Sequence, residues 1–400
     1  MRFEQIQLGE ICGISSSKRI FAKEYEKKGI PFYRGKEIIE KYNGKAVSNE
    51  LYISRERYEE IKERYGTPKR GDILLTSVGT LGIPWLVDED EFYFKDGNLT
   101  WLSVKKNIES TYLYWWLISP EAKNQIDAKS IGSTQKALTI DTLNKFVISL
   151  PSVEVQKKIC NVLQSLQDKI CVNTAINKNL EEQARALFKA WFEDYEPFGG
   201  EVPNEFTSMT LGRVAEIKTD SMSPSKNPNV KVEHYSIPAY DEKHFPVFET
   251  TDDIKSNKYI ITDKSVIISK LNPDTKRIWR PMCLSEHPIC STEFIVYEAR
   301  NPAHKDFLYS LIDSKPFFNH LCSHTTGSTN SRQRATPSTT LDFEFVLPSD
   351  EWIKKFCLIV TPMYDTISAN LIENQTLAAL RDTLLPRLMS GEIDVSNIEI

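Results

Sequence analysis

The sequence contains no long uninterrupted run of apolar residues, although 40% of its 400 residues are hydrophobic. A membrane-spanning helix needs roughly 18 such residues in succession, and no stretch approaches that length. The opening residues, Met1-Arg2-Phe3-Glu4, also lack the apolar segment of a signal peptide. We therefore expect a cytoplasmic protein with no membrane partner, and the length suggests about two to four domains, each with its own core.

Cysteine is scarce and shows no pairing pattern. The seven cysteines include no C-x-x-C motif, and an odd number does not form a closed disulfide framework, so we expect reduced, mostly buried thiols. Cysteine and histidine gather in the second half of the chain, where they raise the question of a zinc site. Because the C-x3-H-x2-C spacing at the start of this group is not a usual zinc pattern, we predict no metal. The group comprises Cys283, His287, Cys290, His320, Cys322 and His324.

Known catalytic motifs are also missing. The chain has no Pro-Pro, which excludes the Asn/Asp-Pro-Pro-aromatic tetrapeptide of adenine and cytosine amino methyltransferases. Gly35-Lys36 lacks the earlier glycine and the following Ser or Thr of a phosphate-binding loop. Asp241-Glu242-Lys243 resembles part of a nuclease site, but in a chain that is 26% charged a solvated loop is the better interpretation. We predict no catalytic residues, and a nuclease or methyltransferase with an unrecognised site remains an alternative.

The net charge of -5 is distributed unevenly along the chain. Residues 1–150 carry 23 Lys and Arg against 21 Asp and Glu, whereas residues 346–400 carry 4 against 8. The acidity is thus concentrated in the last segment. A moderately acidic chain can still bind nucleic acid, because local clusters of Lys and Arg make the contacts.

The main feature of the sequence is a segment that occurs twice, 197 residues apart. Each copy has apolar positions at alternating spacings of four and three, which is the seam of a helix with a seven-residue repeat. The first copy comprises Ile159, Leu163, Leu166, Ile170, Asn173, Asn177, Leu180, Ala184, Leu187 and Trp191. The second comprises Phe356, Val360, Met363, Ile367, Asn370, Asn374, Leu377, Arg381, Leu384 and Leu388. We infer an internal duplication, and each seam, roughly 48 Å long at 1.5 Å per residue, favours a spacer helix.

Both helices are introduced in the same way. Gly132-Ser133-Thr134 precedes Leu150-Pro151, and Gly327-Ser328-Thr329 precedes Leu347-Pro348. Proline at this point is typical of a strand-to-helix junction, since it ends strand pairing and suits the first helical turn. Pro362 lies inside the second helix and predicts a kink or a late start of that helix.

The regions before the two helices predict two mixed α/β units built on one plan. In the first unit we expect an opening strand at 7–11, a strand at 30–36, a buried strand at 71–76 and an aromatic helix at 111–119. In the second unit the matching segments are 211–214, 264–269 and 307–311. Between these segments the two units barely agree. We interpret the shared parts as scaffold and the divergent parts as surfaces that do the same work on different targets.

This layout resembles the specificity subunit of type I restriction–modification systems, over the whole chain. Besides the Gly-Ser-Thr and Leu-Pro motifs, the resemblance rests on residues 187–192 (LFKAWF) and 384–393 (LLPRLMSGEI), which close the two helices. Gln156 matches the family's usual glutamine, and the second copy departs from it with Ile353. The resemblance implies an α/β (α+β) fold with two similar globular target-recognition domains separated by two long antiparallel helices that form a coiled coil, an internal pseudo-two-fold repeat. The implied domains are target-recognition domain 1 (1–151), a central conserved helix (152–195), target-recognition domain 2 (196–348), and a distal conserved helix with the C-terminal tail (349–400).

The resemblance also implies a non-catalytic subunit that recognises a bipartite, asymmetric site in double-stranded DNA. The implied protein partners are two modification (methyltransferase) subunits and restriction/translocase subunits, and the assembled complex would be an N6-adenine DNA methyltransferase and ATP-dependent endonuclease. No cofactor is expected on this chain, because S-adenosylmethionine, ATP and Mg are implied for the partner subunits. A coiled-coil protein-interaction scaffold without DNA specificity remains the alternative, and salt-dependent binding of one DNA sequence over others would exclude it.

The candidates for DNA contact are side chains that suit base edges and phosphates. Arg and Lys suit guanine, Asn and Gln suit adenine, and phosphate contacts fix the register. In the first unit they are Lys18, Arg19, Arg34, Lys36, Thr76, Ser77, Thr80, Asn98, Ser133, Thr134, Gln135 and Lys136. In the second unit they are Lys270, Lys276, Arg277, Arg280, Ser328, Thr329, Ser331, Arg332, Gln333 and Arg334. The last four form the strongest group, because two guanidinium groups and an amide stand beside a Gly-Ser-Thr turn.

Two asparagines interrupt each apolar seam and predict how the two helices pair. An asparagine in such a seam is costly unless it meets another polar group. Facing residues of an antiparallel pair have numbers with a constant sum, and a sum of 547 gives the pairs Asn173–Asn374 and Asn177–Asn370. The same sum places Leu166 against Arg381, whose guanidinium we expect to bend out to solvent.

Overall fold

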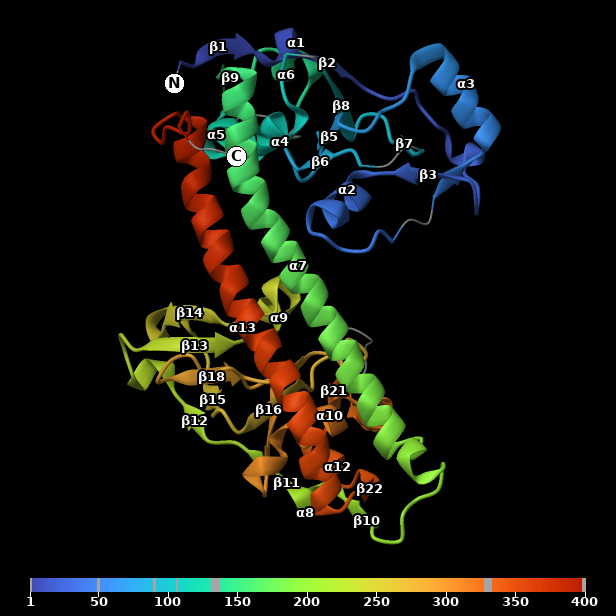
Figure 1. The fold of residues 1–400 in the computed structure, drawn as a ribbon, viewed down its shortest axis with the longest axis vertical. Coiled ribbons are helices and arrows are strands. Elements are labelled where there is room, and N and C mark those ends of the chain that lie inside the picture. The colour runs from blue at the N-terminus through green and yellow to red at the C-terminus, as the bar shows by residue number, and fades with distance from the viewer. Residues whose placement is uncertain are drawn as a thin grey trace. The chain divides into compact units, whose positions relative to one another are not determined.

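The computed structural model describes residues 2–48, 51–88, 91–105, 107–130, 137–326 and 333–397. The chain forms two compact units. Unit 1 consists of Met1–Ile170 together with Gln375–Ile400, and unit 2 consists of Cys171–Asn374. Both units contain helices and strands, which Figure 1 colours along the chain, so the predicted mixed α/β class is confirmed. The finer division into four segments stays a prediction.

Unit 1 is built from short strands and mostly short helices. Its elements, in chain order, are β1 (Glu4–Gln7), α1 (Leu8–Ile11), β2 (Cys12–Ser15), β3 (Ile30–Tyr33), α2 (Gly35–Tyr42), β4 (Tyr52–Ile53), α3 (Arg55–Tyr65), β5 (Ile73–Thr76), β6 (Pro84–Leu86), β7 (Tyr93–Phe94), β8 (Leu99–Val104), α4 (Ser110–Ile118), α5 (Pro120–Ser130), α6 (Ile140–Asn144) and β9 (Val147–Leu150). The long helices α7 (Val153–Phe192) and α13 (Asp350–Met389) each belong in part to unit 1 and in part to unit 2.

Three small sheets organise unit 1. Strands β1 and β9 pair antiparallel, a four-stranded sheet has the order β2-β8-β5-β6, and a three-stranded sheet has the order β4-β3-β7. The main core contains Tyr112, Trp115 and Trp116 of α4, packed in one cluster with Ile159 of α7 and Leu388 of α13. The predicted aromatic helix and the predicted buried strand, β5, are therefore confirmed.

Unit 2 repeats this plan with additions. Its elements are β10 (Thr207–Thr210), α8 (Leu211–Val214), β11 (Ala215–Lys218), β12 (Ser221–Met222), β13 (Lys231–Tyr235), α9 (Ile237–Lys243), β14 (Val247–Thr250), β15 (Lys258–Ile260), β16 (Ser265–Ser269), β17 (Ile278–Trp279), β18 (Pro288–Ser291), β19 (Phe294–Ala299), α10 (Lys305–Asp313), α11 (Lys315–Ser323), β20 (Thr325–Thr326), β21 (Arg334–Ala335), α12 (Pro337–Thr340) and β22 (Glu344–Leu347).

The scaffold of the two units is the same and their second sheets differ. In unit 2, β10 pairs with β22 as β1 does with β9, and the order β11-β19-β16-β17 repeats β2-β8-β5-β6. Within the described ranges, the second sheet of unit 2 has five strands in the order β12-β15-β18-β13-β14, and that of unit 1 has three. Within these sheets β13 corresponds to β3, because each has one antiparallel and one parallel neighbour and leads into a short helix.

Four local expectations are wrong in whole or in part. Gln7 is the last residue of β1, but residues 8–11 and 211–214 are not strands: they form single helical turns, α1 and α8, each between two strands. Asp241-Glu242-Lys243 is the last turn of α9 and not a loop. Pro151 and Pro348 follow the strands as predicted, but they lie before the first helical turn, since α7 begins at Val153 and α13 at Asp350. Helix α13 begins well before Pro362, which excludes a late start, and the alternative, a kink at Pro362, stays a prediction.

Helices α7 and α13 lie side by side and antiparallel within each unit (Figure 1). In unit 2, Asn173 Nδ2 donates to Asn374 Oδ1 at 3.0 Å and to Glu373 Oε2 at 2.7 Å, and Asn370 Nδ2 donates to Asn177 Oδ1 at 2.8 Å. These are the two pairs that the sum of 547 specifies. Asn173 and Asn177 are buried, so these hydrogen bonds to the facing helix take the place of hydrogen bonds to water.

The expectation for Arg381, in unit 1, is wrong. Its Nη1 donates to Gln167 Oε1 of the facing helix at 2.6 Å, and its Nε and Nη2 donate to Asp382 Oδ1. The side chain is 23% exposed, so the guanidinium stays at the helix pair instead of bending into solvent. A glutamine beside the seam supplies an acceptor that the apolar pattern alone did not reveal.

Asn173→Leu is expected to lower the free energy of unfolding by about 1–3 kcal/mol, because it removes the hydrogen bond that Asn374 Oδ1 accepts. The control is Asn173→Leu with Asn374→Leu, which removes both polar groups and should recover most of the loss. Denaturant unfolding of the two single variants and the double variant gives the coupling free energy. Additive losses would show that the pair does not act as a unit.

The C-terminal tail belongs to the core of unit 1. Val395 is fully buried, and Ile393 packs against the same cluster as Trp116. Gly391 has φ +77°, and a Cβ there would collide with the Phe3 ring, so a glycine lets the chain turn close to the N-terminal strand. Lys158 Nζ of α7 donates to Ser396 O at 2.6 Å. Among the residues described, no helix has the length and apolarity that would let it cross a membrane.

Candidate nucleic-acid interface

Three segments that are far apart in the sequence meet around one pocket in unit 1. They are the turn from β3 into α2, the turn after β5, and the residue before β8. The pocket has a volume of about 490 Å³. Its lining residues are Arg34, Gly35, Lys36, Ile39, Glu40, Thr76, Val78, Thr80 and Asn98. Five residues that the sequence analysis proposed for DNA contact are therefore brought together by the fold.

Arg34 is held at this pocket by a buried carboxylate. It stands at the N-cap of α2, and its backbone N–H donates to Glu37 Oε2 at 2.7 Å. Its guanidinium donates to the same carboxylate through Nε at 3.3 Å and through Nη2 at 2.6 Å. The Glu37 side chain is completely buried, whereas the Arg34 side chain is 33% exposed. The cation therefore reaches solvent in a fixed orientation.

The other candidates at this pocket differ in their exposure. Thr76 is buried, and its Oγ1 accepts from Ile83 N at 2.9 Å, so its hydroxyl maintains the turn after β5. Ser77, just outside the lining, is also buried and hydrogen bonds to Thr100 Oγ1 at 2.5 Å. Thr80 is exposed, and Asn98 is half-buried. Thr80 and Asn98 are thus better placed for a ligand than Thr76 or Ser77.

The remaining candidates of unit 1 lie outside the lining of the pocket. Lys18 places its Nζ 4.4 Å from the centre of the Tyr65 ring. Arg19 is 70% exposed and pairs with Asp96 Oδ2 at 2.9 Å. Residues 133–136 lie outside the described residues.

In unit 2, Arg334 is held at the surface much as Arg34 is in unit 1. Its Nε and Nη2 donate to the two oxygens of Glu293, both at 3.0 Å, and its side chain is 46% exposed. This guanidinium lowers the pKa of the Glu293 carboxyl, with Lys270 adding to the effect. The segment of Gln333 and Arg334 lies beside Lys270, because Ala335 N donates to Lys270 O and Asn272 N donates to Gln333 O. Three of the predicted residues therefore gather, while Ser328, Thr329, Ser331 and Arg332 lie outside the described residues.

The other three cations of unit 2 that were proposed for DNA contact and are described by the structure are engaged with acidic side chains. Arg277 donates through Nε and Nη2 to Asp241 at 2.7 and 2.8 Å. Arg280 is only 16% exposed and binds both Asp306 and Asp365. Lys276 pairs with Asp313. Their proposed contacts with DNA stay predictions, and the geometry gives each of them a part in holding unit 2 together.

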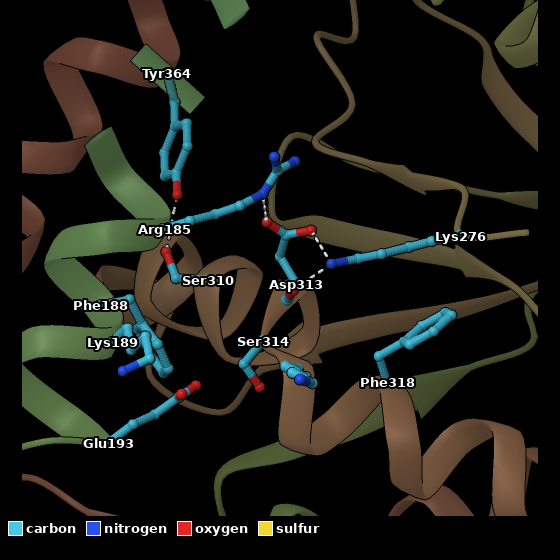
Figure 2. Close-up of a pocket in the computed structure, with 11 residues that line it drawn as sticks. Arg185, Phe188, Lys189, Glu193, Lys276, Ser310, Asp313, Ser314, Phe318 and Tyr364 are labelled. Carbon is cyan, nitrogen blue, oxygen red and sulfur yellow. Dashed lines mark hydrogen bonds and ion pairs between the residues drawn. The ribbon is translucent and has the colours of Figure 1, made fainter. Parts of the chain in front are cut away.

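Lys276 belongs to a second pocket, of about 470 Å³, within unit 2 (Figure 2). Figure 2 shows Arg185 of α7 and Lys276 of the β16–β17 loop reaching one carboxylate from two sides. Arg185 Nε lies 2.5 Å from Asp313 Oδ2, and Lys276 Nζ lies 2.5 Å from Asp313 Oδ1. Nearby, burial raises the pKa of the Glu181 carboxyl. The charges of the cations are compensated by these acids, so we interpret the cluster as a set of stabilising ion pairs and not as an anion-binding site.

The cysteines and histidines of unit 2 form no metal centre within the described ranges. No group of three or more His, Cys, Asp or Glu is placed there to hold an ion. His320 Nε2 instead lies 3.0 Å from the Thr339 carbonyl. Burial raises the pKa of the Cys283 thiol to about 12, and the thiol of Cys290 is buried too, which makes both unsuited as thiolate ligands or nucleophiles.

Glu37 and Glu293 are the residues that the sequence analysis missed. Both are acidic, and only cations and neutral polar groups were considered for contact with an anionic ligand. Glu37 had a local signal, because a glutamate three residues after an N-cap position is the second half of a capping box. Glu293 had none, since it lies 41 residues from Arg334 and reaches it through the fold.

Known proteins share both sequence and fold with this chain. Residues 2–182 match the family model of the type I restriction modification DNA specificity domain. The chain is 26% identical to the type I restriction enzyme HindI specificity subunit of Haemophilus influenzae, over 81% of this chain and 87% of that protein. It is 25% identical to the MjaIX specificity subunit of Methanocaldococcus jannaschii, over 98% of this chain and 93% of that protein.

The fold agrees with these sequence matches. The crystal structure of a type I restriction–modification S subunit from M. genitalium superposes with a TM-score of 0.58 and 16% identity, covering 97% of this chain and 96% of that one. At that identity the likeness concerns the fold alone. The chain is thus similar to type I restriction–modification DNA specificity subunits in its domain match over residues 2–182, in its two relatives matched over most of their length and in its fold.

Proposed function

We propose that this chain selects the DNA sequence on which a type I restriction–modification complex acts. Specificity subunits are non-catalytic components of these systems, so methylation and cleavage would come from the partner subunits. The observation that carries the proposal is the duplicated scaffold with unlike second sheets: two similar frames present different surfaces. A chain that must recognise two different half-sites needs this combination, whereas a scaffold based on the coiled coil alone does not.

In this proposal, residues 1–151 and 196–348 are the two target-recognition domains. The pocket at Arg34 and the group at Arg334 are their centres of contact. The Asn173–Asn374 and Asn177–Asn370 pairs would fix the register of the helices and hence the spacing of the two half-sites, about one turn of DNA apart. Base contacts select the sequence, while the exposed cations around them hold phosphates.

The proposal also assigns the partners. Two modification subunits, carrying S-adenosylmethionine, would be positioned on the two half-sites, and restriction subunits would add ATP-dependent translocation and cleavage with Mg. No cofactor is assigned to this chain. Because its ligand is DNA and its partners act on DNA, we place the complex in the cytoplasm.

Exchanging residues 201–345 for those of a relative is expected to change one half of the recognised sequence and leave the other half intact. The physical reason is that bases are read by side chains of one domain at a time. The measurement is methylation-sensitive sequencing of a host that carries the exchanged chain with its partner subunits. The matched control exchanges residues 1–150, which should change the other half only.

Two outcomes would contradict the proposal. A change of both halves by either exchange would show that the two domains do not read independently. Binding of the unexchanged complex to all DNA sequences alike, at low and at moderate salt, would favour the protein-interaction scaffold instead.

A further inference from the structure

We propose that Arg34 reads a guanine in the half-site of the first domain, and that Glu37 is its positioning residue. This inference rests on the proposed function. It concerns the pocket of unit 1, where Arg34 lies beside Lys36, Thr80 and Asn98.

The duplicated scaffold provides an internal comparison for this position. Strand β13 corresponds to β3 and α9 to α2, so Ser236 takes the place of Arg34, and Ala239 takes the place of Glu37. Ser236 caps its helix in the ordinary way, because its Oγ accepts from Ala239 N at 3.2 Å. Serine is a strongly preferred N-cap residue, and arginine is not. The scaffold therefore does not require arginine in unit 1.

Its partner Glu37 adds to the energetic cost of placing an arginine at this N-cap. Glu37 is a charged side chain with no exposed surface, and such groups are rare in proteins unless they are paired. Three hydrogen bonds to Glu37 come from Arg34, one from the backbone and two from the guanidinium. A buried acid that serves the N-cap arginine, at a position where unit 2 has Ala239, indicates that orientation of the guanidinium is what is needed here.

The orientation suits a base and not simply a charge. Glu37 holds the Nε and Nη2 side of the guanidinium, which turns the Nη1 edge away from the carboxylate. A planar fork with a fixed direction matches the O6 and N7 acceptors of guanine in the major groove, which is the commonest specific contact of arginine. A phosphate contact does not need a fixed side-chain orientation, because the charge of a mobile lysine is sufficient to make it. The exposed Lys36, with 59% of its side chain in solvent, fits that second role.

The experiment uses the complete complex and a set of duplexes in which each position of both half-sites is varied. For Arg34→Lys we expect discrimination at one G·C pair of the first half-site to fall by roughly 5- to 150-fold, because the ammonium keeps the charge but loses the fork. Glu37→Gln should lower discrimination at the same pair, by a smaller factor. The second half-site should be read as before. Methylation rates of the same duplexes provide an independent readout.

Two controls separate recognition from folding. Arg34→Ser with Glu37→Ala installs the cap of the second unit, so it should melt close to the original protein and still lose the preference for guanine. Arg55→Lys changes another arginine of unit 1, one that pairs with Glu91 at the surface and lies outside the pocket lining, and should alter neither affinity nor sequence preference.

The outcomes are distinguishable. Equal weakening of all duplexes by Arg34→Lys would make Arg34 a phosphate contact and overturn the inference, as would unchanged discrimination in the double variant. Either result leaves the proposed function intact as long as the unmodified complex prefers one two-part sequence. Absence of any preference in the unmodified complex would overturn the proposed function itself.

Discussion

Phe356→Ala is expected to lower the stability of unit 2 by about 3–5 kcal/mol, which is typical for removal of a fully buried aromatic side chain. Phe356 of α13 has no exposed surface. Its ring centre lies 5.8 Å from that of Phe188 and 5.2 Å from that of Phe192, both on α7, and 6.4 Å from that of Phe307 on α10. The truncation would open a cavity where the helix pair meets the globular part of the unit.

The duplication supplies the control for this prediction. The equivalent position in the first copy is Ile159, which is also fully buried. Phe356→Ile keeps most of the apolar volume, so it should lose less than half as much. Because the chain has two units, the loss is best measured by hydrogen exchange of buried amides in each unit during denaturant titration. A loss of less than 1 kcal/mol for Phe356→Ala would contradict the packing described for unit 2.

Asp313→Asn is expected to have the second-largest effect, a loss of about 2–3 kcal/mol. Removing one partner of a buried ion pair commonly costs about 3–5 kcal/mol, because the other charge is left without compensation. Here Asp313 is 4% exposed, but Arg185 is 50% and Lys276 is 28% exposed. Water can therefore solvate part of both cations, which reduces the expected loss.

Asp241→Asn is the matched control, because Asp241 pairs with Arg277 in the same unit but is 47% exposed. It should cost less than about 1 kcal/mol. Thermal or denaturant unfolding at two salt concentrations provides the comparison, and the effect of Asp313→Asn should depend less on salt, since buried pairs are screened less. Equal losses for the two variants would show that burial does not decide the strength of this cluster.

The parts of the fold that the sequence predicted depend on local periodicity. The seam of α7 and α13 repeats every seven residues, and the asparagines that interrupt it needed partners, so the pattern specified both helices and their pairing. Trp115 and Trp116 likewise lie in the helix expected from their neighbours. The opening segments were misread because α1 and α8 are four-residue turns, too short for either helical or strand periodicity to show.

The site could be predicted only in part, because exposure depends on partners far along the chain. By residue type alone, Lys276 and Arg277 are as suitable for DNA contact as Arg34. Each of them, however, forms an ion pair with an acidic residue 36 or 37 positions away. No pattern in their neighbourhood indicates this. The candidates that line the pocket in unit 1 could be proposed because cations and small polar residues stand at strand ends, where turns place them at the surface.

Unit 1 is built from two separate stretches of the chain, which constrains the order in which the two units can complete their folding. The core that holds Trp116 and Ile159 also contains Leu385, Leu388, Met389 and Val395, which leave the ribosome only after all of unit 2. Unit 2, in contrast, is one continuous stretch of chain. During translation the core of unit 1 therefore stays incomplete until unit 2 has been made, so nascent chains expose the apolar surface of unit 1 throughout the synthesis of unit 2.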